Sequence, residues 1–132
     1  MIIRTLSLCG VLLCACGSPG GGDGTGGGDG SSSVTCTPSA SLKSDVSNGR
    51  TVVTATGAVS CSGATDLSLE TCLQRDNGGT FTDVQCVSDT QSAVASLSLD
   101  SAAGCIGTAT FRARVVVNGQ PQTSAAQSVT CL

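Results

Sequence analysis

Nine cysteines are the residues of this chain with the most definite chemistry, because sulfur can form disulfides, bind metal ions or act as a nucleophile. The chain contains no histidine, and no two cysteines after Cys16 stand in a C-x-x-C spacing. Zinc sites built from cysteine use such close pairs or recruit histidine. A Ser-His-Asp or Cys-His catalytic arrangement also requires histidine. The cysteines therefore point to disulfides, and we expect no metal and no other cofactor.

Carboxylates are the other residues with catalytic chemistry. Glu70 is the only glutamate, and a pair with Asp66 or Asp83 would have the composition of a glycosidase acid–base pair. Carboxylates that only keep a sheet soluble are far more common. The chain also lacks the G-x-S-x-G, phosphate-loop and H-E-x-x-H motifs. We therefore expect no catalytic residues and a protein that is not an enzyme.

The N-terminal segment carries a targeting pattern. Arg4 precedes an apolar run over 6–13, which ends in Leu13-Cys14-Ala15-Cys16. Eight residues are too few to span a bilayer as a helix, but they suit the apolar part of a signal peptide. The pattern resembles the lipobox of bacterial lipoproteins, in which the cysteine after a small residue receives lipid. The alternative is an ordinary secretory signal that is cut after a small residue.

The lipobox resemblance implies a lipoprotein signal peptide over 1–15 and a diacylglycerol thioether on Cys16, with a further acyl chain in many bacteria. Two or three acyl chains would anchor the protein to a lipid bilayer durably. Because Gly17 rather than aspartate follows the cysteine, the family rule favours the outer membrane if the cell is Gram-negative. We expect an exported protein that is lipid-anchored to the cell envelope.

Residues 16–33 combine the lipidated cysteine with a linker of glycine, serine and aspartate, which offers no hydrophobic side chain to bury. We expect this segment to be a disordered tether. The whole chain has six basic and nine acidic residues, a net charge of −3, and loss of Arg4 with the signal peptide makes it −4. This balance argues against nucleic acid as a partner.

Processing before Cys16 explains the cysteine count. It removes Cys9 and Cys14, and lipidation uses Cys16, so that six of the nine cysteines remain. An even number in an exported chain predicts three disulfides. The domain has only two aromatic residues, Phe81 and Phe111. Its small side chains bury little apolar surface, so the fold needs such covalent links.

The segment 34–132 has the composition of a single all-β domain. Valine, threonine, serine and alanine dominate, and apolar residues alternate with polar ones, as on half-buried strands. We predict an antiparallel β-sandwich of about seven strands; a small Greek-key barrel is the alternative. The predicted strands are 34–47, 50–61, 67–75, 81–87, 91–99, 106–117 and 122–131.

The cysteines lie symmetrically about three turns that contain Asn-Gly, a strong hairpin signal. A two-residue Asn48-Gly49 turn places Cys36 opposite Cys61, and the other two pairs centre on Gly79 and Asn118. We therefore predict the disulfides Cys36–Cys61, Cys72–Cys86 and Cys105–Cys131. A bridge between two sheets, as in antibody domains, is the main competitor.

Side-chain alternation places Cys72 on the face opposite Leu67, Leu69 and Leu73. The middle disulfide, Cys72–Cys86, is therefore expected on the solvent side of its sheet.

The segment 107–115, Gly-Thr-Ala-Thr-Phe-Arg-Ala-Arg-Val, resembles the penultimate strand of immunoglobulin-like and fibronectin type III-like domains. The resemblance implies one sheet from the first, second and fifth predicted strands and another from the remaining four. The chain departs from these families because it has no tryptophan and no tyrosine.

Arg112 and Arg114 stand two residues apart on a predicted strand and so point to the same face, where Arg75 could join them. The three arginines are a candidate patch for an anion or for an unidentified protein or glycan partner. The alternative is a solvated outer face, which we favour. Sugar sites usually stack on tryptophan or tyrosine, and the chain has neither.

The sequence thus favours a membrane-anchored envelope lipoprotein with a non-catalytic binding or structural module. The alternative is a secreted or tethered inhibitor or accessory protein that acts on an envelope or extracellular enzyme through a rigid loop. The turn at 77–81 is the first candidate for such a loop, although Phe81 is more readily explained as a core residue.

Overall fold

A computed structural model describes residues 33–132, and Val34–Leu132 form one compact unit. The expected signal peptide, the lipid acceptor Cys16 and nearly all of the expected tether lie outside the described residues. The compact unit contains six strands and, in its described residues, no helix. The strands are β1 (Cys36–Ser47), β2 (Arg50–Asp76), β3 (Phe81–Cys105), β4 (Gly107–Val117), β5 (Gln120–Thr123) and β6 (Gln127–Cys131).

The first hairpin forms as its sequence predicts. Asn48 and Gly49 both have positive φ, 53° and 72°, which is the requirement of a two-residue type I′ turn. Ser47 pairs with Arg50, and the register continues without a shift to Cys36 opposite Cys61. The turn therefore sets which side chains of β1 face the core.

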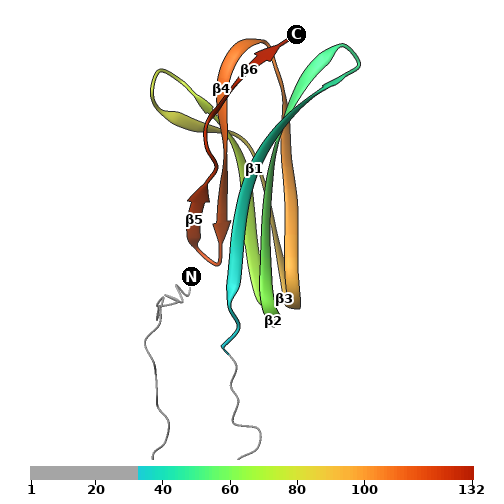
Figure 1. Cartoon of the computed structure of the whole chain (residues 1–132), viewed down its shortest axis with the longest axis vertical. Coiled ribbons are helices and arrows are strands. Elements are labelled where there is room, and N and C mark those ends of the chain that lie inside the picture. The colour runs from blue at the N-terminus through green and yellow to red at the C-terminus, as the bar shows by residue number, and fades with distance from the viewer. Residues whose placement is uncertain (1–32) are drawn as a thin grey trace, which may run out of the picture. The chain divides into compact units, whose positions relative to one another are not determined.

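The second hairpin is a long ribbon that bends back on itself. β2 and β3 pair along nearly their whole lengths, and the turn between Asp76 and Phe81 contains two glycines with positive φ. The register shifts between Ser60 and Leu67, and Ala93 on the facing strand has φ 55°. The ribbon bends at this irregular point, and Figure 1 shows the bend at the end of the molecule opposite the β1–β2 turn.

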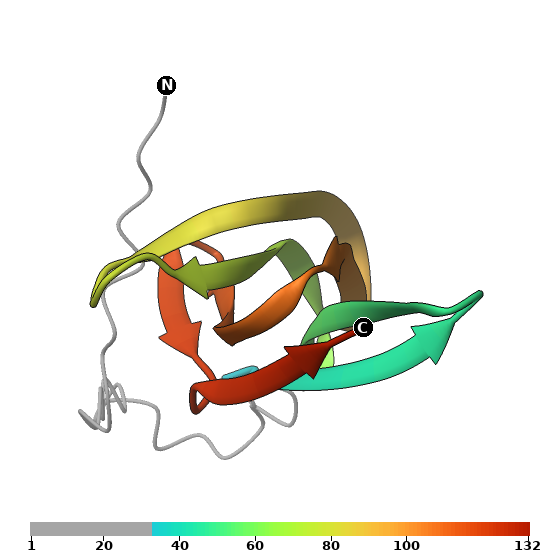
Figure 2. The same ribbon diagram turned by 90° about the horizontal axis from the view of Figure 1, so that it is seen from above.

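The bend turns one ribbon into parts of two layers. The first half of β2 pairs with β1 on one side and with the second half of β3 on the other. The second half of β2 lies between the first half of β3 and β4, and β4 also pairs with β5 and β6. Figure 2 shows the strands surrounding a common interior. The predicted antiparallel β architecture is confirmed, with every pairing antiparallel.

The strand boundaries differ from the prediction in three respects, the first being that β3 continues to Cys105 instead of ending at 99. The predicted strands 50–61 and 67–75 are one strand, and so are 81–87 and 91–99, because pairing continues through the bend. The predicted strand 122–131 is instead interrupted at 124–126, which separates β5 from β6. The strand segments of each layer are those that the immunoglobulin-like resemblance assigned to one sheet.

The core consists mainly of small and medium-sized aliphatic side chains. Phe111 is its only aromatic residue, with 2% of its surface exposed. The two halves of the ribbon contact each other across this core: Gly57 lies against Thr71, and the buried Ser101 hydroxyl donates a hydrogen bond to the carbonyl oxygen of Gln85 at 2.7 Å. The fully buried large side chains include Leu67, Leu69, Leu73, Val53, Val59 and Val115.

The three predicted disulfides are all present: Cys36–Cys61, Cys72–Cys86 and Cys105–Cys131. The first two join residues that are directly opposite each other in their hairpins. The third does not arise from a hairpin about Asn118. Cys105 ends β3 opposite Thr51, while Cys131 pairs with Gly107, so this bridge joins the end of β3 to β6.

Candidate functional site

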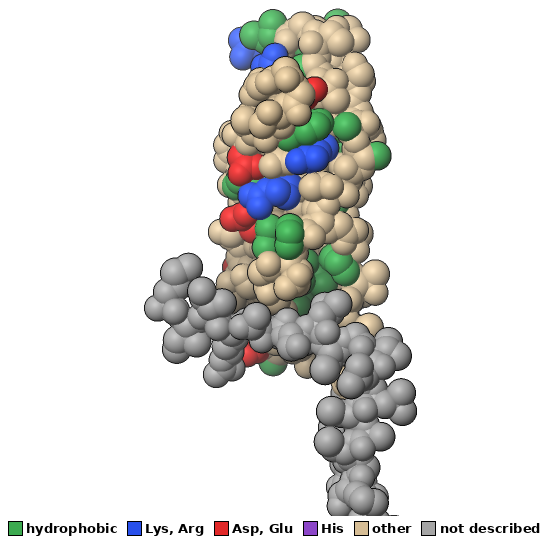
Figure 3. All heavy atoms as spheres, turned by 90° about the vertical axis from the view of Figure 1, so that its left-hand side faces the viewer, with side chains coloured by type: hydrophobic (Ala, Val, Ile, Leu, Met, Phe, Trp, Pro, Cys, Tyr) green, Lys and Arg blue, Asp and Glu red, His purple; other side chains and the backbone are tan. Residues whose placement is uncertain are grey.

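The candidate arginine patch lies on the outer face of the layer that β2, β3 and β4 form. Alternation along β4 buries Phe111, Ala113 and Val115 and turns Arg112 and Arg114 outward. Cys72, Glu70 and Gln74 of β2 belong to the same outer face, since Cys72 pairs with Arg114 and Gln74 pairs with Arg112. Figure 3 shows basic and acidic side chains next to one another in the middle of this side of the molecule.

Arg114 is held by two carboxylates from two strands. Its Nη2 atom lies 3.1 Å from Oε1 of Glu70 and 3.2 Å from Oδ2 of Asp83. The side chain of Arg114 is 27% exposed and each carboxylate side chain is 42% exposed, so water screens these ion pairs only in part. The arginine therefore joins β4 to both strands of the ribbon.

Arg112 is held by polar and aromatic contacts. Its Nε donates to Oε1 of Gln74 at 2.7 Å, and Gln74 in turn donates to Oδ1 of Asp83 at 2.8 Å. The guanidinium carbon of Arg112 stands 4.1 Å from the centre of the Phe81 ring, a cation–π distance. Phe81 is thus a half-buried outer-face residue, which corrects its expected place in the core.

Arg75 does not join the other two arginines. It is directly opposite Phe111 in the β2–β4 ladder, and directly opposed residues point to the same side of a sheet. Since Phe111 points into the core, Arg75 is on the other face of the layer from Arg112 and Arg114. The structure therefore brings together two of the three predicted patch residues.

The charges of this outer-face cluster, Glu70, Asp83, Arg112 and Arg114, balance one another. Two guanidinium groups face two carboxylates, and the cluster offers no excess of positive charge to an anion. The same contacts bear on the acid–base pair considered for Glu70: Arg114 bridges Glu70 and Asp83, while Asp66 accepts a hydrogen bond from the backbone of Ala93 at the bend. The ion pairs and hydrogen bonds of this cluster are suited to holding β2, β3 and β4 together.

The middle disulfide belongs to the same outer face, as predicted. Cys72 is fully buried under its neighbours, whereas Cys86 on β3 is exposed. Nη2 of Arg114 lies 3.4 Å from Sγ of Cys72. The ligand atoms of Cys72, Asp83 and Cys86 lie within 4.8 Å of one another, but the two sulfurs are bonded together and neither is a thiolate. The group therefore lacks the ligands of a thiolate metal site.

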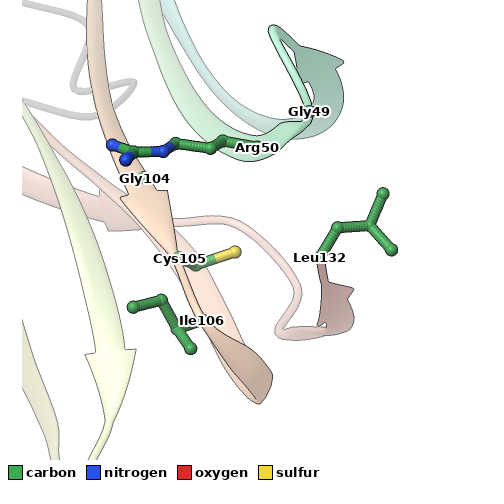
Figure 4. A pocket seen from close by; sticks show the side chains of 6 residues that line it. All are labelled: Gly49, Arg50, Gly104, Cys105, Ile106 and Leu132. Carbon is green, nitrogen blue, oxygen red and sulfur yellow. The ribbon is translucent and has the colours of Figure 1, made fainter.

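A second candidate site lies at the end of the domain where β1 meets β2 and β3 meets β4. An open hollow there has Ile106 and Leu132 on its rim together with Arg50, and Figure 4 shows their side chains around it. Ile106 is 87% exposed, the highest value among the large hydrophobic residues of the described chain. It occupies the turn between two strands, directly after the disulfide-bonded Cys105. The sequence instead predicted Ile106 as the first residue of the strand 106–117, whereas β4 begins at Gly107.

Comparison of the chain with protein-family models and with curated proteins finds no match. Within residues 33–132, no helix is long and apolar enough to cross a bilayer.

Proposed function

We propose that this protein is an exported lipoprotein of the cell envelope whose β domain serves as a non-catalytic binding or structural module. The proposal that the protein is exported is supported by one observation: all six cysteines of the described domain are paired in three disulfides. Such bonds form and persist in oxidising compartments outside the cytoplasm. The domain assignment to the immunoglobulin-like or fibronectin type III-like families is part of this proposal, and the strand pairings support it.

The direction of β1 supports a tethered arrangement. The domain begins at Val34, beside the Cys36–Cys61 end, and the twelve residues of β1 lead to the opposite end, about 40 Å away. Arg50 and Ile106 lie at that opposite end. A chain anchored through lipid on Cys16, upstream of the domain, would leave this far end free to meet a partner in the envelope.

Mass spectrometry of the mature N-terminus, isolated from the native envelope, tests the proposal directly. We expect a peptide that begins at Cys16 and carries a diacylglycerol group, with the domain cysteines resistant to alkylation until a reductant is added. Cys16→Ser should abolish lipid incorporation, while Cys14→Ser, a matched change two residues earlier, should leave it intact. An unmodified N-terminus, or lipid that persists in Cys16→Ser, would contradict the anchor.

A tethered inhibitor or accessory protein is the second candidate, and exposed Ile106 favours it. The turn that presents this side chain follows a disulfide-bonded residue, so little conformational entropy is lost on binding. The fitting partner would be an envelope or extracellular enzyme with an apolar pocket. We expect such an enzyme to co-purify in near-stoichiometric amount and to be lost with Ile106→Asp. Equal recovery with Ile106→Asp and with wild type would exclude Ile106 as the contact.

A further inference from the structure

The outer edge of β3 differs from the other strand edges of the domain. β3 runs for 25 residues and, among the described residues, pairs with β2 alone, so one side of its backbone has no strand partner. An edge of this kind presents N–H and C=O groups that can pair with another strand. The free edge is therefore a candidate interaction surface.

The other edges carry proline, lysine or short strands, which oppose pairing, whereas the 96–105 half of β3 has Asp100 as its only charged residue and no shift in its register with β2. β1 contains Pro38 and Lys43, and the edge beyond β4 is divided between the short β5, which contains Pro121, and β6. Proline and lysine on edges, and short edge strands, are common ways in which proteins avoid edge-to-edge association. β3 contains no proline, lysine or arginine.

The second half of β3 is also the regular part of this edge. From Ser96 to Cys105 the register with β2 is uninterrupted, and the irregular position at Ala93 lies just outside this segment. Leu97 and Leu99 point inward, opposite Val59 and Gly57 of β2, and are half-buried. Ser96, Ser98 and Asp100 alternate with these two leucines and point outward, with Asp100 accepting a hydrogen bond from Thr56 at 2.6 Å.

We propose that two copies of this chain associate through antiparallel pairing of their β3 edges, with the twofold axis at Ser98. In this register each Leu97 is opposite Leu99 of the other copy, so apolar side chains meet on the inner side. On the outer side Ser98 meets Ser98, and each Asp100 meets Ser96. A register centred on Asp100 would instead oppose two carboxylates directly, which is destabilising. The nearly symmetrical order Ser-Leu-Ser-Leu-Asp about Ser98 thus suits a second copy of the same strand, and Asp100 selects the register.

Two lysine substitutions on the same outer face test this register. Ser98→Lys places two ammonium groups opposite each other at the twofold axis, and we expect the dimer dissociation constant to rise roughly five- to tenfold. Ser96→Lys places each ammonium opposite Asp100 of the other copy, and we expect the constant to fall roughly fivefold. Ser44→Lys on β1 adds the same charge away from β3 and should change it little.

The measurement is sedimentation equilibrium of the full-length chain in density-matched detergent, over a wide concentration range. Opposite shifts for Ser96→Lys and Ser98→Lys, with Ser44→Lys close to wild type, support the twofold pairing. A wild-type chain that remains monomeric at the highest concentration overturns the proposal. Equal shifts for the two β3 variants, or tighter association of Ser98→Lys alone, also overturn it, since both contradict the register.

Discussion

Gly57 of the first half of β2 lies directly against Thr71 of the second half, where the bent ribbon packs on itself. A Cβ at position 57 would overlap Oγ1 of Thr71 and would stand 2.8 Å from Cγ2 of Val115. Neither neighbour can move away readily, because Thr71 and Val115 are both fully buried. The closeness of the two layers at this point therefore depends on the absence of a side chain at Gly57.

We accordingly expect Gly57→Ala to destabilise the domain by about 3 kcal/mol, the upper range of overpacking costs in well-packed cores. Urea unfolding of the oxidised protein measures the change. Gly104→Ala is the matched control, because its Cβ would meet only the carbonyl oxygen of Thr51, at 4.0 Å. Equal stability of the two variants would show that the two layers leave room for a Cβ at position 57, contrary to the contact with Thr71.

The Gly57–Thr71 contact further predicts that Thr71→Ala partly rescues Gly57→Ala. Thr71 Oγ1 is a buried oxygen without a hydrogen-bond partner in the described structure, so its removal costs no hydrogen bond. In a double-mutant cycle we expect the double variant to be at least 1 kcal/mol more stable than the sum of the single changes. Strict additivity would mean that the two residues do not contact each other.

Much of the fold could be predicted because its signals are local. The Asn48-Gly49 turn fixes a register over twelve pairs, and the Cys36–Cys61 bridge follows from that register. The Cys105–Cys131 pair was predicted correctly for a different reason from the one observed. Cys105 belongs to β3, and the interruption after β5 moves Cys131 opposite Gly107. Symmetry about Asn118 does not describe this bridge.

The continuity of β2 and the composition of the outer-face cluster could not be predicted, since both depend on contacts between distant residues. The bend near Thr65 has the composition of a loop, yet Thr65 still pairs with Val94. Strand alternation correctly grouped Arg112 with Arg114. The separation of Arg75 from them depends on the ladder partner Phe111, which a single strand does not reveal.

Asn118 offers a prediction that separates backbone strain from a side-chain hydrogen bond. It has φ 47°, and its Oδ1 accepts a hydrogen bond from the backbone N–H of Ser68 at 2.8 Å. We expect Asn118→Ala to lose about 2 kcal/mol of stability, because alanine neither accepts this bond nor favours positive φ. Asn118→Gly should lose only about 1 kcal/mol, since glycine adopts positive φ without strain. If both variants unfold at the same urea concentration, positive φ contributes nothing here.

Arg114 should contribute modestly to stability and in a salt-dependent way. Because its ion pairs with Glu70 and Asp83 are partly exposed, we expect Arg114→Gln to cost about 1 kcal/mol at low salt and less at high salt. Thermal unfolding at two ionic strengths measures both effects. Lys43→Gln is the control, as its ion pair with Asp45 spans 3.9 Å between largely exposed side chains. An equally small effect of both changes would mean that the ion pairs of Arg114 add no stability.

The three disulfides should open in a defined order under a dithiol reductant. A reductant thiolate attacks a disulfide sulfur, forms a mixed disulfide with it and displaces the other sulfur as a thiolate; the second thiol of the reductant then releases the first cysteine. Cys86 is the exposed member among the six bonded cysteines, and Cys105 and Cys131 are buried. When Cys72 leaves, Nη2 of Arg114, 3.4 Å from its sulfur, stabilises the thiolate.

We therefore expect Cys72–Cys86 to be reduced first and Cys105–Cys131 last as the dithiothreitol concentration rises. Alkylation of the free thiols followed by peptide mass spectrometry identifies the order. Arg114→Gln should slow the opening of Cys72–Cys86, whereas Arg112→Gln, which removes a guanidinium held by Gln74 and Phe81, should have less effect. If the half-buried Cys36–Cys61 bridge opened first, exposure of Cys86 would not control the order. In that case the hairpin that Cys72–Cys86 closes would be better protected from the reductant than the exposure of Cys86 indicates.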